Sequence, residues 1–425
     1  MAFTQFKHSG TLNPEISVCE KKHSSFAEKA AEEGIVLLKN ENILPISLSA
    51  SVALLGIGAD KTVKGGIGSG DVNNRQNITI YEGMEESGIR ITSRDWLDDY
   101  EHRYQKARLI WKEKILEEAK HVNNPFDAYA SNPFIMPEGR PVSEMDIQEA
   151  EIVVYVISRI SGEGKDRRLE KGDYYLSERE EKDILFLNSR CVPIVLLINA
   201  GGPVELTDIL EKAQWIKGIL NISQLGQEGG RAVARILLGE AVPSGKLTTT
   251  WAKKYADVPF AENFSYLNGN LDTEEYKEGI FVGYRWNDRE RIKPLFCFGH
   301  GLSYTTFEYG KVTAEGRQMG PDGTITVSVP VKNTGSRAGA EIVQLYVSDL
   351  KSSLPRPVKE LKGFRKITLQ PGQEQTVSFT IDRKALSFYD DTKQDWVAEP
   401  GAFEALVGAS ACDIRGKAAF ELTAR

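Results

Sequence analysis

Short, continuous apolar runs separated by helical patterns constrain the fold of this chain more than any other feature of its sequence. Runs of this length and continuity are typical of buried parallel strands, and they lie at 51–58, 152–158, 193–199 and 214–221. Apolar residues at helical spacing lie at 25–38, 79–87, 95–119 and 177–188. Strands that alternate with helices predict an α/β sandwich, with a mostly parallel, doubly wound sheet.

The periodicity changes after about residue 320. Thr324–Val331 alternates apolar and polar residues strictly, and further short apolar runs follow, separated by turns such as Asn333–Gly335 and Gln370–Gly372. About seven short strands in roughly a hundred residues predict a β-sandwich. We therefore expect an α/β domain with an N-terminal helix, an ordered linker and an all-β domain, at residues 1–250, 251–319 and 320–425 respectively.

Composition excludes several classes of protein. The chain has 53 basic and 60 acidic residues and a net charge of −7, whereas a nucleic-acid-binding protein of this size is usually basic. The first residues lack the apolar core of a secretory signal, and the apolar runs are shorter than the roughly 20 residues of a membrane helix. The sequence therefore predicts a cytoplasmic protein with neither a nucleic-acid partner nor a membrane partner.

Cysteine and histidine spacing adds further exclusions. The four cysteines are far apart and form no C-x-x-C pair, which argues against a zinc ribbon or a dense disulfide framework and favours a reducing compartment. The five histidines form no H-x-x-x-H or H-E-x-x-H motif, and no G-x-S-x-G motif is present. No metal or organic cofactor is predicted.

Two loops are the first places to look for function, because ligands of α/β sheets bind at the carboxyl ends of strands. The first, Lys64–Asp71, is rich in glycine, but polar residues rather than a helix follow it, so it matches a nucleotide-binding loop poorly. A tight turn that needs positive φ explains its glycines as well. Ser69 and Asp71 could still donate or accept hydrogen bonds to a polyhydroxylated ligand.

The second loop, Ser158–Arg167, carries Glu163 between two glycines, where a carboxylate can reach outward with little steric cover. An exposed loop glutamate is more often merely solvated, so the pattern alone does not assign it a role. Arg167 is expected to orient the loop through ion pairs. The segment Asn124–Pro141 contains four prolines and is predicted to be irregular, either a lid or a plain surface connection.

Six motifs in order along the chain resemble glycoside hydrolase family 3, specifically its β-glucosidases. They are Ala30–Asn40 with Leu44 and Pro45, Lys64–Asp71, Ser158–Arg167, Gly226–Gly230, Pro243–Leu247 and Phe298–Tyr304. The resemblance runs from about residue 25 to 425. It implies that the first domain is the α/β sandwich domain of that family and that the last is its fibronectin type III-like domain.

The resemblance also implies roles for individual residues. Glu163 matches the general acid/base of the family, and Ser69 matches a serine that contacts the terminal sugar of a β-glucoside. Asp71 and Arg167 neighbour these positions and are supporting residues at most. Members of the family usually carry the nucleophilic aspartate on a (β/α)8 barrel, and these residues contain no such barrel pattern.

Two arrangements fit this departure from the family. The chain is either the front half of a member with reversed domain order or a separate subunit that pairs with a barrel chain. Because a retaining glycosidase needs two carboxyl groups roughly 5–5.5 Å apart, we expect little turnover by this chain alone. A non-catalytic carbohydrate-binding or scaffold subunit is the alternative. An apolar face that would dock the barrel predicts self-association as a homo-oligomer.

Overall fold

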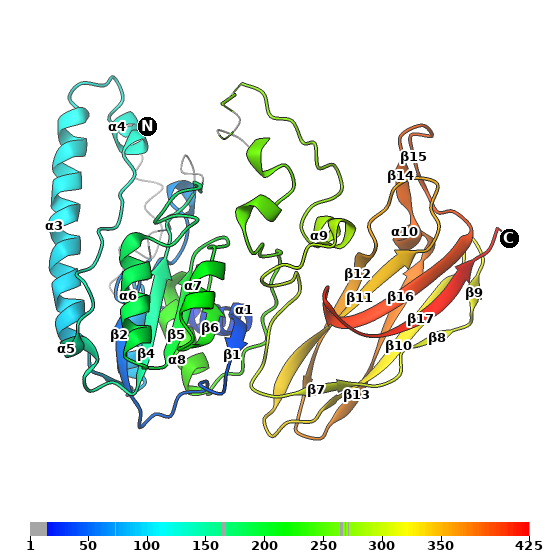
Figure 1. The fold of residues 1–425 in the computed structure, drawn as a ribbon, viewed down its shortest axis with the longest axis horizontal. Helices are drawn as coiled ribbons and strands as arrows, with labels where there is room; N and C mark the ends of the chain where they lie inside the picture. The colour runs from blue at the N-terminus through cyan, green and yellow to red at the C-terminus, as the bar shows by residue number, and fades with distance from the viewer. Residues whose placement is uncertain are drawn as a thin grey trace. The chain divides into compact units, whose positions relative to one another are not determined.

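The computed structural model describes residues 15–72, 74–162, 167–263, 267, 269–270 and 272–424, without the side chain of Ser69. It divides into two compact units, Met1–Ala241 and Val242–Arg425 (Figure 1). The first unit is an α/β sandwich and the second is built mainly from β-strands. This confirms the predicted fold class.

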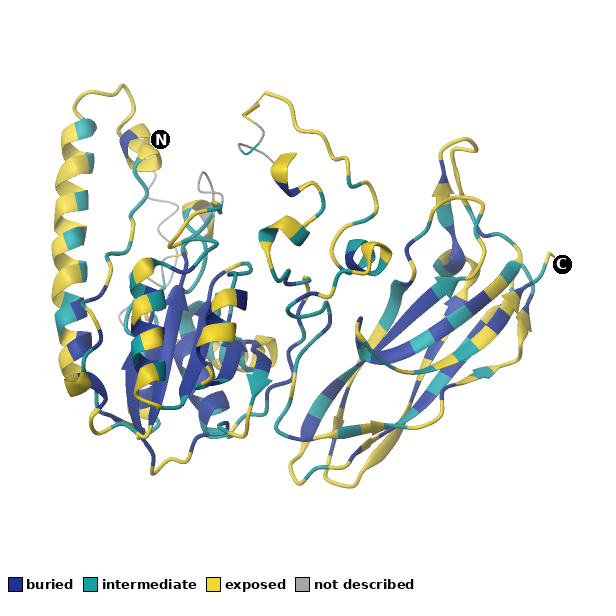
Figure 2. Ribbon diagram, in the orientation of Figure 1, coloured by how far each residue is buried: buried dark blue, intermediate teal, exposed yellow. Residues whose placement is uncertain are grey.

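A six-stranded sheet forms the centre of the first unit, in the order β1-β6-β5-β4-β2-β3. Its strands are β1 (Val36–Asn40), β2 (Ser51–Leu55), β3 (Arg90–Ile91), β4 (Ile152–Ser158), β5 (Ile194–Asn199) and β6 (Ile216–Asn221). All neighbours run parallel except β1, which is antiparallel to β6. Every residue of β2, β4 and β5 is buried (Figure 2), which explains why their sequences are almost continuously apolar.

Helices cover both faces of this sheet. The helices are α1 (Val18–Gly34), α2 (Ile80–Glu86), α3 (Arg94–Glu118), α5 (Glu144–Ile147), α6 (Glu178–Ser189), α7 (Thr207–Lys212) and α8 (Gly229–Leu238). Helices α6 and α7 lie on one face, and α1 and α2 pack with α8 on the other (Figure 1). Right-handed crossovers require this arrangement, because the chain runs from β2 to β3 in one direction and from β4 to β6 in the other.

The predicted helix at 25–38 is wrong at both ends. Helix α1 begins earlier because Ser17 and Glu20 form a capping box, and it ends at Gly34. Val36–Asn40 is strand β1 instead, paired with β6. The apolar run in Val36–Asn40 continues the helical spacing, and only its burial against a distant strand decides the outcome.

Helix α3 is much longer than the strands beside it. Its 25 residues span about 38 Å at 1.5 Å per residue, whereas a strand of five to seven residues spans about 17–23 Å. The buried side chains of α3, Trp96, Leu97 and Tyr100, all lie in its first two turns. Because β3 has two residues, α3 starts at the amino end of the sheet and extends beyond the carboxyl ends of the strands (Figure 1).

The prolines of Asn124–Pro141 predicted an irregular segment, but part of it is helical. It contains the helix α4 (Pro125–Ser131), in which Pro125 occupies the first turn and the side chain of Asn124 accepts a hydrogen bond from the amide of Phe126. Helix α4 packs against α3. Within the described residues, no helix combines the length and the apolarity needed to cross a membrane.

The second unit contains a β-sandwich. One sheet comprises β13 (Glu374–Asp382), β10 (Thr324–Asn333), β7 (Phe307–Tyr309) and β8 (Thr313–Glu315), and the other comprises β12 (Glu360–Leu369), β11 (Gly339–Asp349), β16 (Gly401–Ser410), β17 (Asp413–Leu422) and β9 (Gln318–Met319). A hairpin of β14 (Phe388–Asp390) and β15 (Asp395–Val397) and the short helices α9 (Tyr284–Glu290) and α10 (Arg383–Leu386) complete it. Buried residues alternate with partly or fully exposed ones along β10, as its sequence predicted.

Residues 242–306, which include most of the predicted linker, belong to the second unit. Trp251 and Phe296 form an isolated antiparallel bridge there, and the amide of Leu247 donates to the carbonyl of His300 over 2.9 Å. A disulfide joins Cys297 to Cys412 across a sequence separation of 115 residues. The spacing of the cysteines did not predict this pair, because its partners meet only in the folded chain.

Candidate active site

The two loops singled out from the sequence meet at the point where the strand order reverses. The chain leaves β2 toward β3 on one side and leaves β4 toward β5 on the other, so the loops that follow these two neighbouring strands begin side by side. Ile67 and Gly162 form a parallel bridge between the two loops, and the amide of Ile67 donates to the carbonyl of Ser161 over 3.1 Å. Backbone bonds therefore hold the glycine loop against the loop that carries Glu163.

The bridge requires glycine at position 162. A Cβ atom there would lie 2.5 Å from the backbone nitrogen of Ile67. We expect Gly162→Ala to lower the free energy of unfolding by about 1–3 kcal/mol, because the loops must separate. Urea unfolding of the purified chain measures this effect. Gly70→Ala is the matched control, since a Cβ at Gly70 meets no atom within 4 Å; an equal loss in both variants would contradict the interpretation.

Asn199, the last residue of β5, connects three loops. Its role was not predicted from the sequence. Its buried side chain accepts from the amide of Val63 (2.8 Å) and donates to the carbonyls of Val63 (2.9 Å) and Ser223 (2.7 Å). The hydroxyl of Ser158 donates to the same amide oxygen over 2.9 Å. An asparagine that ends a continuous apolar strand is the signal that could have indicated this role.

Arg159 and Glu180 form a buried ion pair directly behind the second loop. The guanidinium of Arg159 donates to both carboxylate oxygens of Glu180 over 2.7 Å, and both side chains are less than one-tenth exposed. Arg159 also donates to the backbone carbonyls of Ser158, Asp173 and Tyr175. The pair thus connects the end of β4 to the segment that follows the loop.

The structure describes the predicted site residues unequally. Glu163 lies outside the described residues, and Ser69 is described only as part of the 3-10 turn Gly68–Gly70. The carboxylate of Asp71 is exposed and pairs with Lys64 over 3.6 Å. Arg167 pairs with Asp173 and donates to the carbonyl of Pro203 over 3.2 Å. Gly162 and Arg167, on either side of the Glu163 segment, are therefore both anchored.

Glu228, which lies in the motif Gly226–Gly230 but received no role from the sequence, anchors the chain after the glycine loop. Burial would raise the pKa of its carboxyl, but hydrogen bonds from Ser24 and Gln76 and the charge of Arg231 outweigh burial and lower the pKa. Glu228 is therefore ionised and holds Gln76 through a 3.1 Å hydrogen bond. Gln76 lies only a few residues beyond Asp71.

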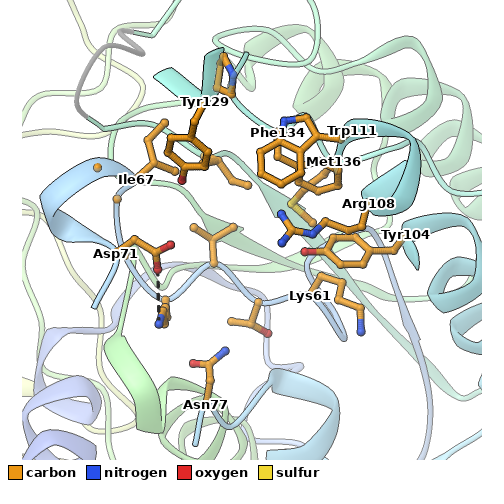
Figure 3. A pocket seen from close by; sticks show the side chains of 18 of the residues that line it. Lys61, Ile67, Asp71, Asn77, Tyr104, Arg108, Trp111, Tyr129, Phe134 and Met136 are labelled. Carbon is orange, nitrogen blue, oxygen red and sulfur yellow. Dashed lines mark ion pairs between the residues drawn. The ribbon is translucent and has the colours of Figure 1, made fainter. Parts of the chain in front are cut away.

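A cavity of about 620 Å³ opens between the glycine loop and the projecting part of α3 (Figure 3). Its lining includes Asp71 and Asn77 on one side, and Tyr104, Arg108, Trp111, Tyr129, Phe134 and Met136 on the other. Ile160, three residues before Glu163, also lines it. In the described part of the chain, no group of three histidine, cysteine or acidic side chains could hold a metal ion.

Comparison with known proteins gives the context of this geometry. Residues 35–284 match the glycosyl hydrolase family 3 C-terminal domain, and residues 341–411 match the fibronectin type III-like domain. The thermostable beta-glucosidase B of Acetivibrio thermocellus is 37% identical over 92% of this chain and 47% of its own length. The beta-glucosidase BoGH3A of Bacteroides ovatus is 36% identical over 95% of this chain and 52% of its own.

Solved structures agree with these relatives. Beta-glucosidase 3B from Thermotoga neapolitana, in complex with glucose, superposes with a TM-score of 0.80 at 35% identity. The match covers 94% of this chain and 54% of that one. The chain thus spans about half the length of the curated relatives that it matches.

Proposed function

This chain belongs to glycoside hydrolase family 3, and from that membership we propose that it is a component of a retaining β-glucosidase. The proposed reaction is the hydrolysis of terminal β-D-glucosyl residues. The observation that carries the proposal is the backbone bridge between Ile67 and Gly162, because it joins the glycine loop to the loop of Glu163 at the carboxyl ends of β2 and β4. This is where ligands bind in α/β sheets.

Each loop then has a distinct task in the reaction. Glu163 protonates the glycosidic oxygen as the bond to the aglycone breaks, and it deprotonates water in the second step. Ser69 donates or accepts a hydrogen bond with the bound sugar, and Asp71 and Arg167 support the two loops. Gly162 and Arg167, the described residues on either side of Glu163, are held by the bridge to Ile67 and by the ion pair with Asp173.

The reaction also needs a nucleophile about 5–5.5 Å from the acid/base. We propose that an aspartate on a (β/α)8 barrel outside these 425 residues supplies it, either fused in the same protein or on a partner chain. The relatives are about twice as long as the region that they share with this chain. This supports a nucleophile that lies on a separate domain or chain. The substrate would then lie against both parts, with Glu163 on the side of the aglycone.

Hydrolysis of 4-nitrophenyl β-glucoside tests the proposal. The purified chain alone should give no turnover, whereas the chain fused to or mixed with the barrel should release nitrophenol. Turnover by the chain alone that disappears in Glu163→Gln would mean that the nucleophile lies within these residues. Sugar binding without turnover in the presence of the barrel would favour the carbohydrate-binding or scaffold alternative.

Compartment and self-association remain predictions. The sequence predicts a cytoplasmic location, whereas the Cys297–Cys412 disulfide favours an oxidising compartment. Exposed apolar side chains on α3, namely Leu109, Ile110 and Leu116, support the expected self-association.

A further inference from the structure

The projecting part of α3 presents one face to the cavity beside the glycine loop. Tyr104, Arg108 and Trp111 are spaced by four and three residues, so they lie on the same side of the helix (Figure 3). Tyr129 and Phe134, from α4 and the segment after it, extend this surface. We call the four aromatic side chains, Tyr104, Trp111, Tyr129 and Phe134, the aromatic wall.

The rings of the aromatic wall hold one another in place. Phe134 makes edge-to-face contacts with Tyr104 and Trp111 at centroid distances of 5.4 and 5.6 Å, and Trp111 makes another with Tyr129 at 5.9 Å. The indole nitrogen of Trp111 donates to the carbonyl of Asn132 over 2.7 Å. The wall is therefore built before any ligand arrives, and binding costs little ordering of its rings.

Arg108 lies over this wall without a carboxylate partner among the described residues. Its guanidinium carbon is 4.6 Å from the ring centre of Trp111 and 4.9 Å from that of Phe134. The lysines of the cavity differ, since Lys61 pairs with Asp60 and Lys64 pairs with Asp71. Arg108 thus presents a planar cation to the cavity, backed by aromatic rings.

The opposite side of the cavity carries polar groups beside Ile67. Asp71 and Asn77 line it, together with the backbone of the glycine loop (Figure 3). The volume of about 620 Å³ lies within the range of ligand sites, roughly 300–1,000 Å³. A ligand that fits both sides has a polyhydroxylated part near the glycine loop and a flat part against the aromatic wall.

The position of Arg108 decides which flat part fits. A second sugar ring stacks its C–H groups on a free aromatic face, but the guanidinium already lies against one face of Trp111 and one face of Phe134. A guanidinium plane instead attracts the electron-rich face of an aromatic ring. The surface that the wall offers therefore suits an aryl group better than a sugar.

We propose that this cavity binds the planar aromatic aglycone of an aryl β-glucoside, with the guanidinium of Arg108 against its ring. The assignment of that ring as an aglycone rests on the proposed function, whereas the preference for an aromatic ring rests on the wall alone. Phenolic glucosides are thus the substrate class, in preference to β-linked glucose disaccharides.

Direct binding to the chain tests this without any turnover. Phenyl β-D-glucoside, methyl β-D-glucoside and cellobiose are titrated separately while the indole N–H signals of the tryptophans are followed by NMR, with Trp111 assigned from Trp111→Phe. Phenyl β-D-glucoside should shift the Trp111 signal and bind more tightly than the other two. Arg108→Gln should weaken its binding roughly two- to fivefold.

Arg103→Gln is the matched control, because Arg103 lies on the same helix but pairs with Asp99 over 2.5 Å. Equal losses in Arg103→Gln and Arg108→Gln, or equal binding of phenyl and methyl glucosides, would overturn the proposal. So would a Trp111 shift with cellobiose alone. A Trp111 response in a chain that hydrolyses no glucoside with its barrel would sink the proposed function but leave the aromatic site standing. Hydrolysis without the Trp111 response would support the proposed function and overturn the aromatic site.

Discussion

Replacing Glu163 with glutamine should lower the turnover of a β-glucoside with a poor leaving group by roughly 10²–10⁴-fold in the protein that includes its barrel. A general acid must hold a proton near neutral pH, which requires a raised pKa, and it must give that proton to the glycosidic oxygen. The glutamine amide keeps the shape of the side chain but transfers no proton at any pH. The loss therefore appears in kcat while the protein still folds.

The choice of substrate sharpens this experiment. A dinitrophenyl glucoside has a leaving group that departs without protonation, so Glu163→Gln should slow its first step far less than that of methyl β-glucoside. Glu170→Gln is a suitable control, because Glu170 is an exposed carboxylate a few residues further along the same segment. Unchanged hydrolysis of methyl β-glucoside by Glu163→Gln would exclude Glu163 as the acid.

Replacing Glu180 with glutamine should destabilise the first unit by about 3–5 kcal/mol, because the guanidinium of Arg159 would stay buried without its counter-charge. Urea unfolding followed by circular dichroism measures the loss. Glu178→Gln is the control, because Glu178 lies two residues earlier, is exposed and pairs with the surface lysines Lys171 and Lys182; it should change stability by about 0.5 kcal/mol or less. A loss below 1 kcal/mol in Glu180→Gln would contradict the buried-pair interpretation.

A double replacement separates stability from positioning. Arg159→Met with Glu180→Leu removes both charges, and such apolar exchanges are often neutral. The double variant should recover most of the stability, yet it still lacks the donors to the carbonyls of Asp173 and Tyr175. Activity in the presence of the barrel should therefore remain low although the fold is restored.

The central strands and most helices could be predicted from the sequence because their signals are local. Ile152–Ser158 is predicted with its observed bounds, since a continuous apolar run marks a strand that is buried on both faces. Strand β1 could not be predicted, because its partner lies far along the chain. Helix α4 was hidden because Pro125, which suggested an irregular segment, is compatible with the first turn of a helix.

The candidate site also has parts that the sequence predicts and parts that it does not. The two loops follow from glycine-rich sequence after apolar strands, and the structure brings them together through Ile67 and Gly162. The roles of Glu163 and Ser69 stay predictions that rest on the resemblance. The contacts of Asn199, of the Arg159–Glu180 pair and of the aromatic wall form only after folding, so the sequence could at most mark single positions, such as an asparagine at the end of an apolar strand.

Asn199 also affects how such a site can diverge among related proteins. Its amide group binds backbone atoms of Val63 and Ser223, not their side chains. These hydrogen bonds therefore do not depend on which side chains stand at the two positions. Side chains elsewhere on the loops can differ, and with them what a ligand meets, without removing the frame that attaches the loops to the sheet.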